Sequence, residues 1–212
     1  MKIIKAQEFK RTPPMMLIYG AEGIGKTTFA AQAPSPVFVK TEEGFPVGVQ
    51  SDSFELCKKF SEVMDCLKAL QTEEHSYKTI VLDYLDGVEM LIHRDILKET
   101  KSDSMATACG GYGRAFSVVN NKMLNELLPA LVDLRDRKGM WVIILAHSSV
   151  TEVTDPIEGN YQHFEPACAH EGWIEQFKNT SDCVFFATGH LRNTNIGSNA
   201  NKRVFKTQAT HK

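Results

Sequence analysis

The chain has 212 residues, the length of one domain. It is 42% hydrophobic and 24% charged, as a soluble globular protein is, and no apolar run approaches the ~18 residues of a membrane-spanning helix, so we expect no membrane partner. The net charge of −2 excludes the strongly basic class of nucleic-acid-binding proteins.

Apolar runs bounded by turn residues predict strands, and apolar residues three or four positions apart predict helices. Residues 1–14 form a lead-in that ends at two prolines. In chain order we then expect a strand at 15–19, a helix at 28–33 ended by Pro34, a strand at 36–40, a helix at about 53–71, a strand at 79–83, a helix at 88–97, a helix at about 114–137 that Pro129 kinks or splits, and strands at 140–146, 183–187 and 203–206.

Two segments, 99–113 and 150–172, lack periodicity and are predicted to be mobile loops. Residues 189–212 form a basic tail, and the chain ends abruptly after a polar segment. The alternation of strands and helices predicts a single α/β domain over residues 1–212, with a mostly parallel central sheet and helices on both faces.

The sequence GAEGIGKT at residues 20–27 fits the phosphate-loop pattern G-x-x-x-x-G-K-[ST], between a predicted strand and a predicted helix. Its glycines let several backbone N–H groups converge on one anion, and its lysine places a charge on the outer phosphates. The candidate nucleotide-binding residues are Gly20, Ala21, Glu22, Gly23, Ile24, Gly25, Lys26, Thr27 and Thr28.

Two oxygen ligands for Mg²⁺ are predicted. The Thr27 hydroxyl is a hard ligand for an ion that keeps most of its waters. Asp83 ends an apolar strand, so its carboxylate is expected at the sheet edge where open α/β folds bind ligands.

Three further side chains end predicted strands at the same edge. Glu42 and Glu43 follow the second strand, and either carboxylate could polarise an attacking water, although both could belong to a solvated turn. Between the two we favour Glu42. His147 ends the fourth strand and is expected to hydrogen-bond a γ-phosphate or the attacking water, unless it only caps the strand.

The remaining signals are weaker. The five cysteines are scattered without a C-x-x-C pair, which indicates reduced thiols and a cytoplasmic location. The spacing of His163, Cys168 and His170 matches no zinc pattern. The glycine-rich stretch GGYGR is either a flexible helix entry or a contact loop in which Tyr112 stacks on bases and Arg114 pairs with phosphate.

The ordered motifs GAEGIGKTT, VFVKTEEG, TIVLD, GGYGRAFSVVNNKMLNELL and WVIILAHSS resemble the RecA-like core ATPases over residues 13–188. The chain is most similar to the short phage-encoded, AAA-type versions thought to act in single-strand annealing or recombination. The resemblance implies that Glu42 activates water and that His147 senses the γ-phosphate, where RecA itself often has glutamine. It also implies that the fourth strand lies between the first and the third.

The resemblance places DNA-binding loops at about 99–113 and 148–172. The second of these carries acidic residues and no Lys or Arg, which is poor for phosphate contact: Glu152, Asp155, Glu158, Glu165 and Glu171. RecA-like active sites lie between subunits, and the partner supplies a basic residue. The resemblance implies that Lys206, or alternatively Arg203 on the opposite face of the predicted last strand, reaches toward a neighbour's nucleotide. Arg114 competes for this role, and the basic residues could instead only solubilise an exposed hairpin.

These observations predict a RecA-like P-loop ATPase that hydrolyses ATP with Mg²⁺ and acts on single-stranded DNA in phage recombination, annealing or replication. The expected partners are ATP and ADP, single-stranded DNA, further copies of the chain in a ring or filament, and a phage single-strand-binding protein, in the host cytoplasm. The alternatives are a small-molecule phosphotransferase and a nucleotide-dependent scaffold with little turnover.

Overall fold

The computed structural model describes residues 12–155, 159–169, 172–190 and 202–207. Its strands are β1 (Met15–Gly20), β2 (Pro36–Lys40), β3 (Asp52–Ser53), β4 (Thr79–Asp83), β5 (Trp141–Asp155), β6 (Gly159–Pro166), β7 (Cys183–His190) and β8 (Lys202–Thr207). Its helical segments are α1 (Lys26–Ala30), α2 (Phe60–Thr72), α3 (Leu85–Thr100), η1 (Ala108–Gly110), α4 (Arg114–Asn121), η2 (Lys122–Leu127), α5 (Leu128–Asp136) and α6 (Ile174–Thr180).

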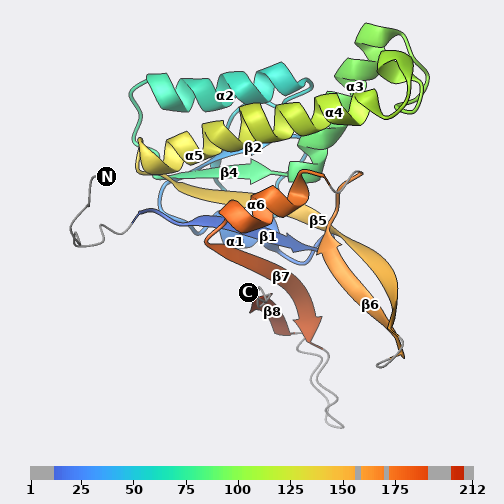
Figure 1. Ribbon diagram of the computed structural model, residues 1–212. Helices are drawn as coiled ribbons and strands as arrows, with labels where there is room; N and C mark the ends of the chain where they lie inside the picture. Colours follow the sequence, from blue (N-terminus) through green and yellow to red (C-terminus); the bar gives the residue numbers. More distant parts are fainter. Residues whose placement is uncertain (1–11, 156–158, 170–171, 191–201, 208–212) are drawn as a thin grey trace, which may run out of the picture.

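The strands form one sheet in the order β3-β2-β4-β5-β1-β7-β8, with β6 paired to β5 outside this path (Figure 1). All neighbours from β3 to β7 are parallel, and β8 is antiparallel to β7. The predicted mostly parallel α/β sheet is therefore confirmed. β5 lies between β4 and β1, the order that the resemblance to RecA-like ATPases implies.

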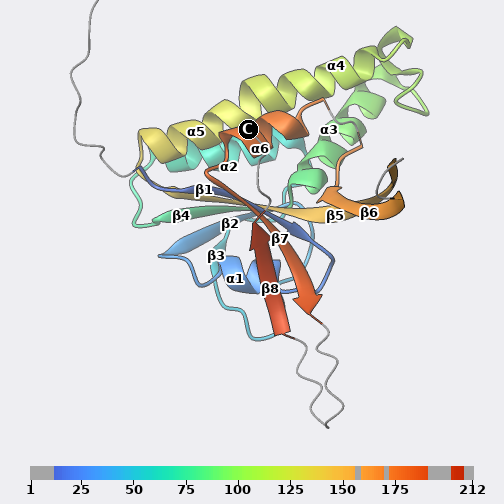
Figure 2. The ribbon, with the colours of Figure 1, turned by 60° about the horizontal axis from the view of Figure 1, so that its bottom comes forward.

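The two faces of the sheet are covered unequally (Figure 2). Helices α2 to α6 lie over one face, whereas α1 lies on the other, beside β8. All five residues of β4 are buried, because both faces of the sheet are covered at this strand. A strand that is buried on both faces has a nearly continuous apolar sequence, as the central strands have here. Ile80 and Leu82 face the larger core under α2 to α6, and Val81 faces the smaller core with α1.

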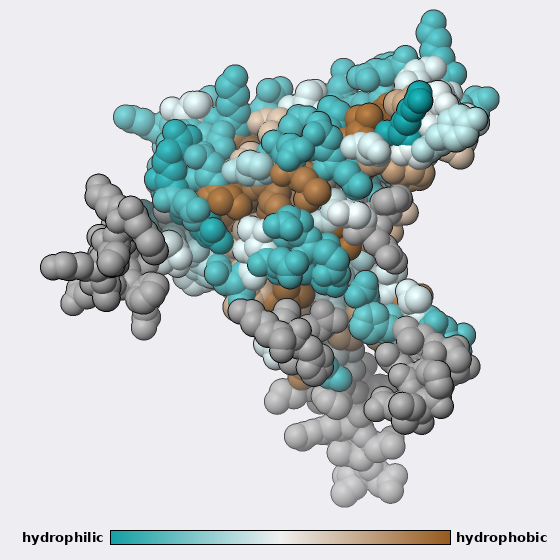
Figure 3. Space-filling model, viewed as in Figure 1, coloured by the Kyte–Doolittle hydropathy of each residue, from teal (hydrophilic) through white to brown (hydrophobic). Residues whose placement is uncertain are grey.

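The outer surface of the helical layer is mainly hydrophilic, with small separated hydrophobic patches (Figure 3). None of the helices in the described ranges is long and apolar enough to cross a membrane.

The start of the helix predicted at 53–71 is wrong, because it was placed several residues before the helix begins in the structure. Helix α2 starts only at Phe60, because the preceding residues run beside β2 as an extended chain. The Phe54 and Cys57 amides donate to the carbonyls of Phe38 and Lys40, and these bonds replace helical ones. The apolar spacing of 54, 57 and 60 was compatible with a helix, but backbone pairing at the sheet edge takes precedence.

The helix predicted at 114–137 is present, and its irregularity lies before Pro129. Residues 122–127 form a π-type segment, η2, between α4 and α5. Proline lacks the N–H that would bond to the carbonyl four residues earlier, so the wider turn falls in the preceding residues.

The segment 150–172 is not the loop that was predicted. β5 continues to Asp155 and pairs antiparallel with β6, from Ser148 opposite Pro166 to Asp155 opposite Gly159. The β-branched residues at 150, 151, 153 and 154 favour this ladder, although their polar neighbours resemble a loop. In Figure 1 the hairpin projects away from the helical layer. Helix α3 likewise extends to Thr100, inside the other predicted loop.

Candidate nucleotide-binding site

The predicted phosphate loop connects β1 to α1 at the carboxyl edge of the sheet. Its lysine is 2% exposed, and its ammonium donates to the carbonyls of Gly20 at 2.8 Å and Ala21 at 3.0 Å. Burial lowers the pKa of Lys26, while the surrounding carboxylates, Asp83 first among them, oppose that shift. Thr27 is also buried, so the side chains of Lys26 and Thr27 are both shielded from bulk solvent.

Thr27 and Asp83 meet in the structure as the sequence analysis expects. The Thr27 hydroxyl lies 3.4 Å from Oδ2 of Asp83, whose side chain is 5% exposed. The other carboxylate oxygen, Oδ1, has no hydrogen-bond partner among the described residues. Burial raises the pKa of Asp83 to about 6, although Lys26 and the Thr27 hydrogen bond lower it. A buried oxygen without a donor, beside a hydroxyl and a lysine, fits a site that a cation completes.

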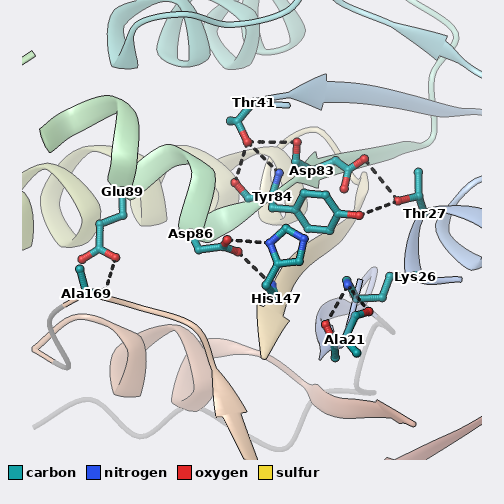
Figure 4. Close-up of polar contacts among 11 residues, drawn as sticks. Ala21, Lys26, Thr27, Thr41, Asp83, Tyr84, Asp86, Glu89, His147 and Ala169 are labelled. Carbon is teal, nitrogen blue, oxygen red and sulfur yellow. Dashed lines mark hydrogen bonds and ion pairs between the residues drawn. The ribbon is translucent and has the colours of Figure 1, made fainter. Parts of the chain in front are cut away.

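His147 lies next to this pair, at the point where β5 leaves the sheet (Figure 4). Its Nδ1 lies 2.8 Å from Oδ2 of Asp86, and its backbone N–H donates to Oδ1 at 2.9 Å. The Tyr84 ring lies beside the imidazole, with ring centroids 4.1 Å apart. The hydrogen bond that the imidazole donates to the Asp86 carboxylate raises the pKa of His147, against the effects of burial and Lys26.

Glu42 is exposed and completes a cluster with these two side chains. One ligand atom each from Glu42, Asp86 and His147 lie within 4.8 Å of one another. The structure therefore brings the predicted water-activating carboxylate and the predicted γ-phosphate sensor together.

The position of Glu42 depends on the residue before it. The Thr41 hydroxyl accepts a hydrogen bond from the Tyr84 amide at 2.9 Å, and the Thr41 amide donates to the Asp83 carbonyl at 2.8 Å. A Cβ at Gly87 would lie 2.0 Å from the Thr41 hydroxyl oxygen, so only glycine allows α3 to approach this closely. The segments that carry Glu42 and Asp83 are therefore held together.

Sequence reasoning missed Thr41, Tyr84, Asp86 and Gly87. Asp86 follows Asp83 by three positions, which was a usable signal, because a helix that starts directly after a strand keeps its first turn at the sheet edge. Asp86 was missed because the helix was predicted to begin at residue 88, whereas α3 begins three residues earlier, at Leu85.

The other sequence candidates lie elsewhere. Tyr112 is 97% exposed and has φ +54°, and Arg114 begins α4. His163 bonds to Glu165 at 3.0 Å, Cys168 is half-buried, and His170 lies outside the described residues. Cys57, Cys66, Cys109 and Cys183 form no disulfide among the described residues. Arg203 and Lys206, the basic candidates of the tail, lie on β8.

Comparison with known proteins decides the family. The family model described as an AAA domain, AAA_24, matches residues 12–212. The chain belongs to this AAA domain family. A search of curated proteins found no match. Membership in the AAA domain family supports an ATPase-type P-loop domain that binds nucleotide. The phage-encoded subgroup stays a prediction.

Several solved structures are similar to this AAA domain. The RadB recombinase is 14% identical over 83% of this chain and 75% of its own, with a TM-score of 0.49. An ATPase from the type III secretion system of pathogenic bacteria is 14% identical over 84% and 52%, with a TM-score of 0.48. The flagellar accessory protein FlaH from Methanocaldococcus jannaschii is 10% identical over 92% and 78%, with a TM-score of 0.46. The chain thus spans about half of the secretion ATPase, and similarity at this level carries no argument about activity.

The ion pair between Asp86 and His147 predicts a pH-dependent stability. Because the folded pKa of His147 is raised above its ordinary value of 6.5, the pair stabilises the protein fully below pH 6.5 and less as pH rises through the folded pKa. Asp86→Asn should therefore lower the free energy of unfolding by about 2 kcal/mol at low pH, and by less at pH 8.5. Urea unfolding at pH 5.5 and 8.5 measures this difference. Asp65→Asn, an exposed carboxylate on α2, is the control, and an equal loss at both pH values would contradict the prediction.

Proposed function

We propose that this protein binds ATP with Mg²⁺ and hydrolyses it, and that the hydrolysis serves work on single-stranded DNA in phage recombination, annealing or replication. The observation that supports hydrolysis is the convergence of Lys26, Thr27, Asp83, Glu42 and His147 at one sheet edge. Such a set supplies what phosphoryl transfer to water requires, which is a phosphate cradle, a metal anchor, a group that orients water and a contact to the γ-phosphate.

In this proposal Gly23, Gly25 and Lys26 hold the phosphates. Thr27 and Asp83 would hold Mg²⁺, directly or through water, since one buried oxygen of Asp83 has no partner in the described part of the chain. When bound, the ion neutralises charge on the phosphates. The remaining chemistry belongs to two side chains of the chain.

Glu42 orients or deprotonates the attacking water. It is exposed, so water reaches it, and Thr41 fixes its backbone against α3. His147 donates a hydrogen bond from Nε2 to the γ-phosphate. Asp86 accepts from Nδ1, which holds the ring orientation and leaves Nε2 directed away from the carboxylate.

Tyr112 supports the proposed contact with single-stranded DNA. Its side chain is 97% exposed between two glycines that also have positive φ angles, and Arg114 follows it. An aromatic ring held on the surface has no role in the core and suits stacking on unpaired bases. The β5–β6 hairpin is disfavoured for this role, because its acidic residues repel phosphate. Assembly into a ring or filament, and a phage single-strand-binding partner, rest on the family resemblance and stay predictions.

Phosphate release with and without single-stranded DNA tests the proposal. Release that rises with DNA supports it. DNA-independent transfer of phosphate to a small acceptor would favour a phosphotransferase. Nucleotide binding without turnover would favour a scaffold.

Tyr112→Ala should weaken binding of fluorescent single-stranded DNA by about 5- to 100-fold, since stacking contributes ~1–3 kcal/mol per base. Fluorescence anisotropy measures the affinity. Tyr112→Phe retains the ring and should bind as the wild type does. If the two variants bind DNA equally well, Tyr112 is not a stacking residue.

A further inference from the structure

Strand β8 lies against the phosphate loop of its own chain. Its partner β7 approaches the loop closely, because a Cβ at Gly20 would lie 2.4 Å from the Ala187 carbonyl oxygen. Phe205, opposite Ala187 in the register, packs on Phe29 of α1 with ring centroids 4.6 Å apart. Figure 2 shows β8 beside α1 on the sparsely covered face of the sheet.

This contact determines which face of β8 meets the loop. Alternation along a strand places Arg203 and Phe205 on one face and Lys206 on the other. Because Phe205 rests on α1, Arg203 faces the phosphate loop. Its Nη1 lies 2.9 Å from the position that a Cβ at Gly25 would occupy, and its Cδ lies 3.7 Å away. Gly25 also has φ +103°, a backbone conformation that disfavours any residue with a side chain.

The guanidinium of Arg203, beside the phosphate loop, has no carboxylate partner among the described residues. Among the described residues Arg203 makes no ion pair, and the ammonium of Lys26 belongs to the same loop. A phosphate bound by this loop would supply the anion that Arg203 lacks among the described residues. An arginine also matches phosphate oxygens in a bidentate manner, whereas lysine supplies a point charge.

The geometry points to Arg203 as a phosphate-binding residue for the nucleoside triphosphate held by its own subunit. The assignment rests on the proposed function, because it requires the loop to bind nucleotide. It replaces the sequence-based hypothesis that Arg203 reaches a neighbour's site.

Equilibrium binding of a fluorescent ATP analogue tests the assignment. Arg203→Ala should weaken binding by about 10- to 100-fold, the usual loss for hydrogen bonds to a charged group, and Arg203→Lys should recover part of it. Arg137→Ala is the matched control, since this exposed arginine directly follows α5 and pairs with Asp133. Arg203 is exposed on an edge strand, so the variant should keep its fold, which circular dichroism checks.

Subunit mixing distinguishes action within one chain from action on a neighbour. Arg203→Ala mixed with Lys26→Ala should regain no ATP binding, because each chain then lacks one of the two cations at its own loop. Recovery on mixing would overturn the assignment, as would Arg203→Ala binding within twofold of the wild type, or a loss found with Lys206→Ala instead. A wild type that binds no nucleotide would refute the proposed function itself.

Discussion

Lys26→Ala is expected to abolish ATP hydrolysis and to weaken ATP binding strongly, while the fold survives. The buried ammonium donates to the carbonyls of Gly20 and Ala21, and it lies 5.0 Å from the centre of the Tyr84 ring. The two hydrophobic cores of the described chain form without it, so the fold should survive its removal. With ATP bound, it is the cation of the phosphate loop. Cations that stabilise a transferring phosphoryl group contribute about 10³–10⁵ in rate, as arginine fingers do.

Phosphate release and equilibrium nucleotide binding measure the two effects of Lys26→Ala. Lys138→Ala is the control, since this lysine is exposed after α5, at the amino-terminal end of β5 and away from the site. Circular dichroism and a thermal melt establish that the variant is folded. Wild-type ATPase activity in a folded Lys26→Ala protein would refute the phosphate-loop assignment.

Glu42→Gln should bind ATP as the wild type does and hydrolyse it at least tenfold more slowly. General bases contribute about 10²–10⁴ in rate, and the amide keeps the size of the side chain but cannot accept a proton from water. Glu42 shares a 4.8 Å cluster with Asp86 and His147, at the position where an attacking water would meet the γ-phosphate in this proposal.

Single-turnover hydrolysis separates this step from ATP binding and product release. Glu43→Gln is the matched control, because Glu43 is exposed and is the next residue in the chain. If hydrolysis is slow in the Glu43 variant and not in the Glu42 variant, the Glu42 assignment is wrong and Glu43 is the water-activating carboxylate.

Much of the fold could be predicted because buried parallel strands are apolar throughout. β1, β2, β4 and the first half of β5 are of this kind, and each was located within about one residue. The hairpin after residue 147 could not be predicted, because its strands alternate polar and β-branched residues as exposed loops also do. The start of α2 was wrong for a related reason, since apolar spacing does not reveal which backbone groups pair with β2.

The sequence by itself was enough to predict the chemistry of the candidate site. The phosphate-loop spacing, an aspartate after an apolar strand, and a glutamate and a histidine after two others are local patterns, and parallel strands bring their carboxyl ends to one edge. Only the tertiary structure decided how these groups are held. Asp86 orients His147 across 61 positions, Gly87 admits Thr41, and Arg203 meets Gly25 from the far end of the chain. Such contacts depend on how closely packed elements approach, and the distance between two side chains far apart in the sequence is set by the fold and not by their spacing along the chain.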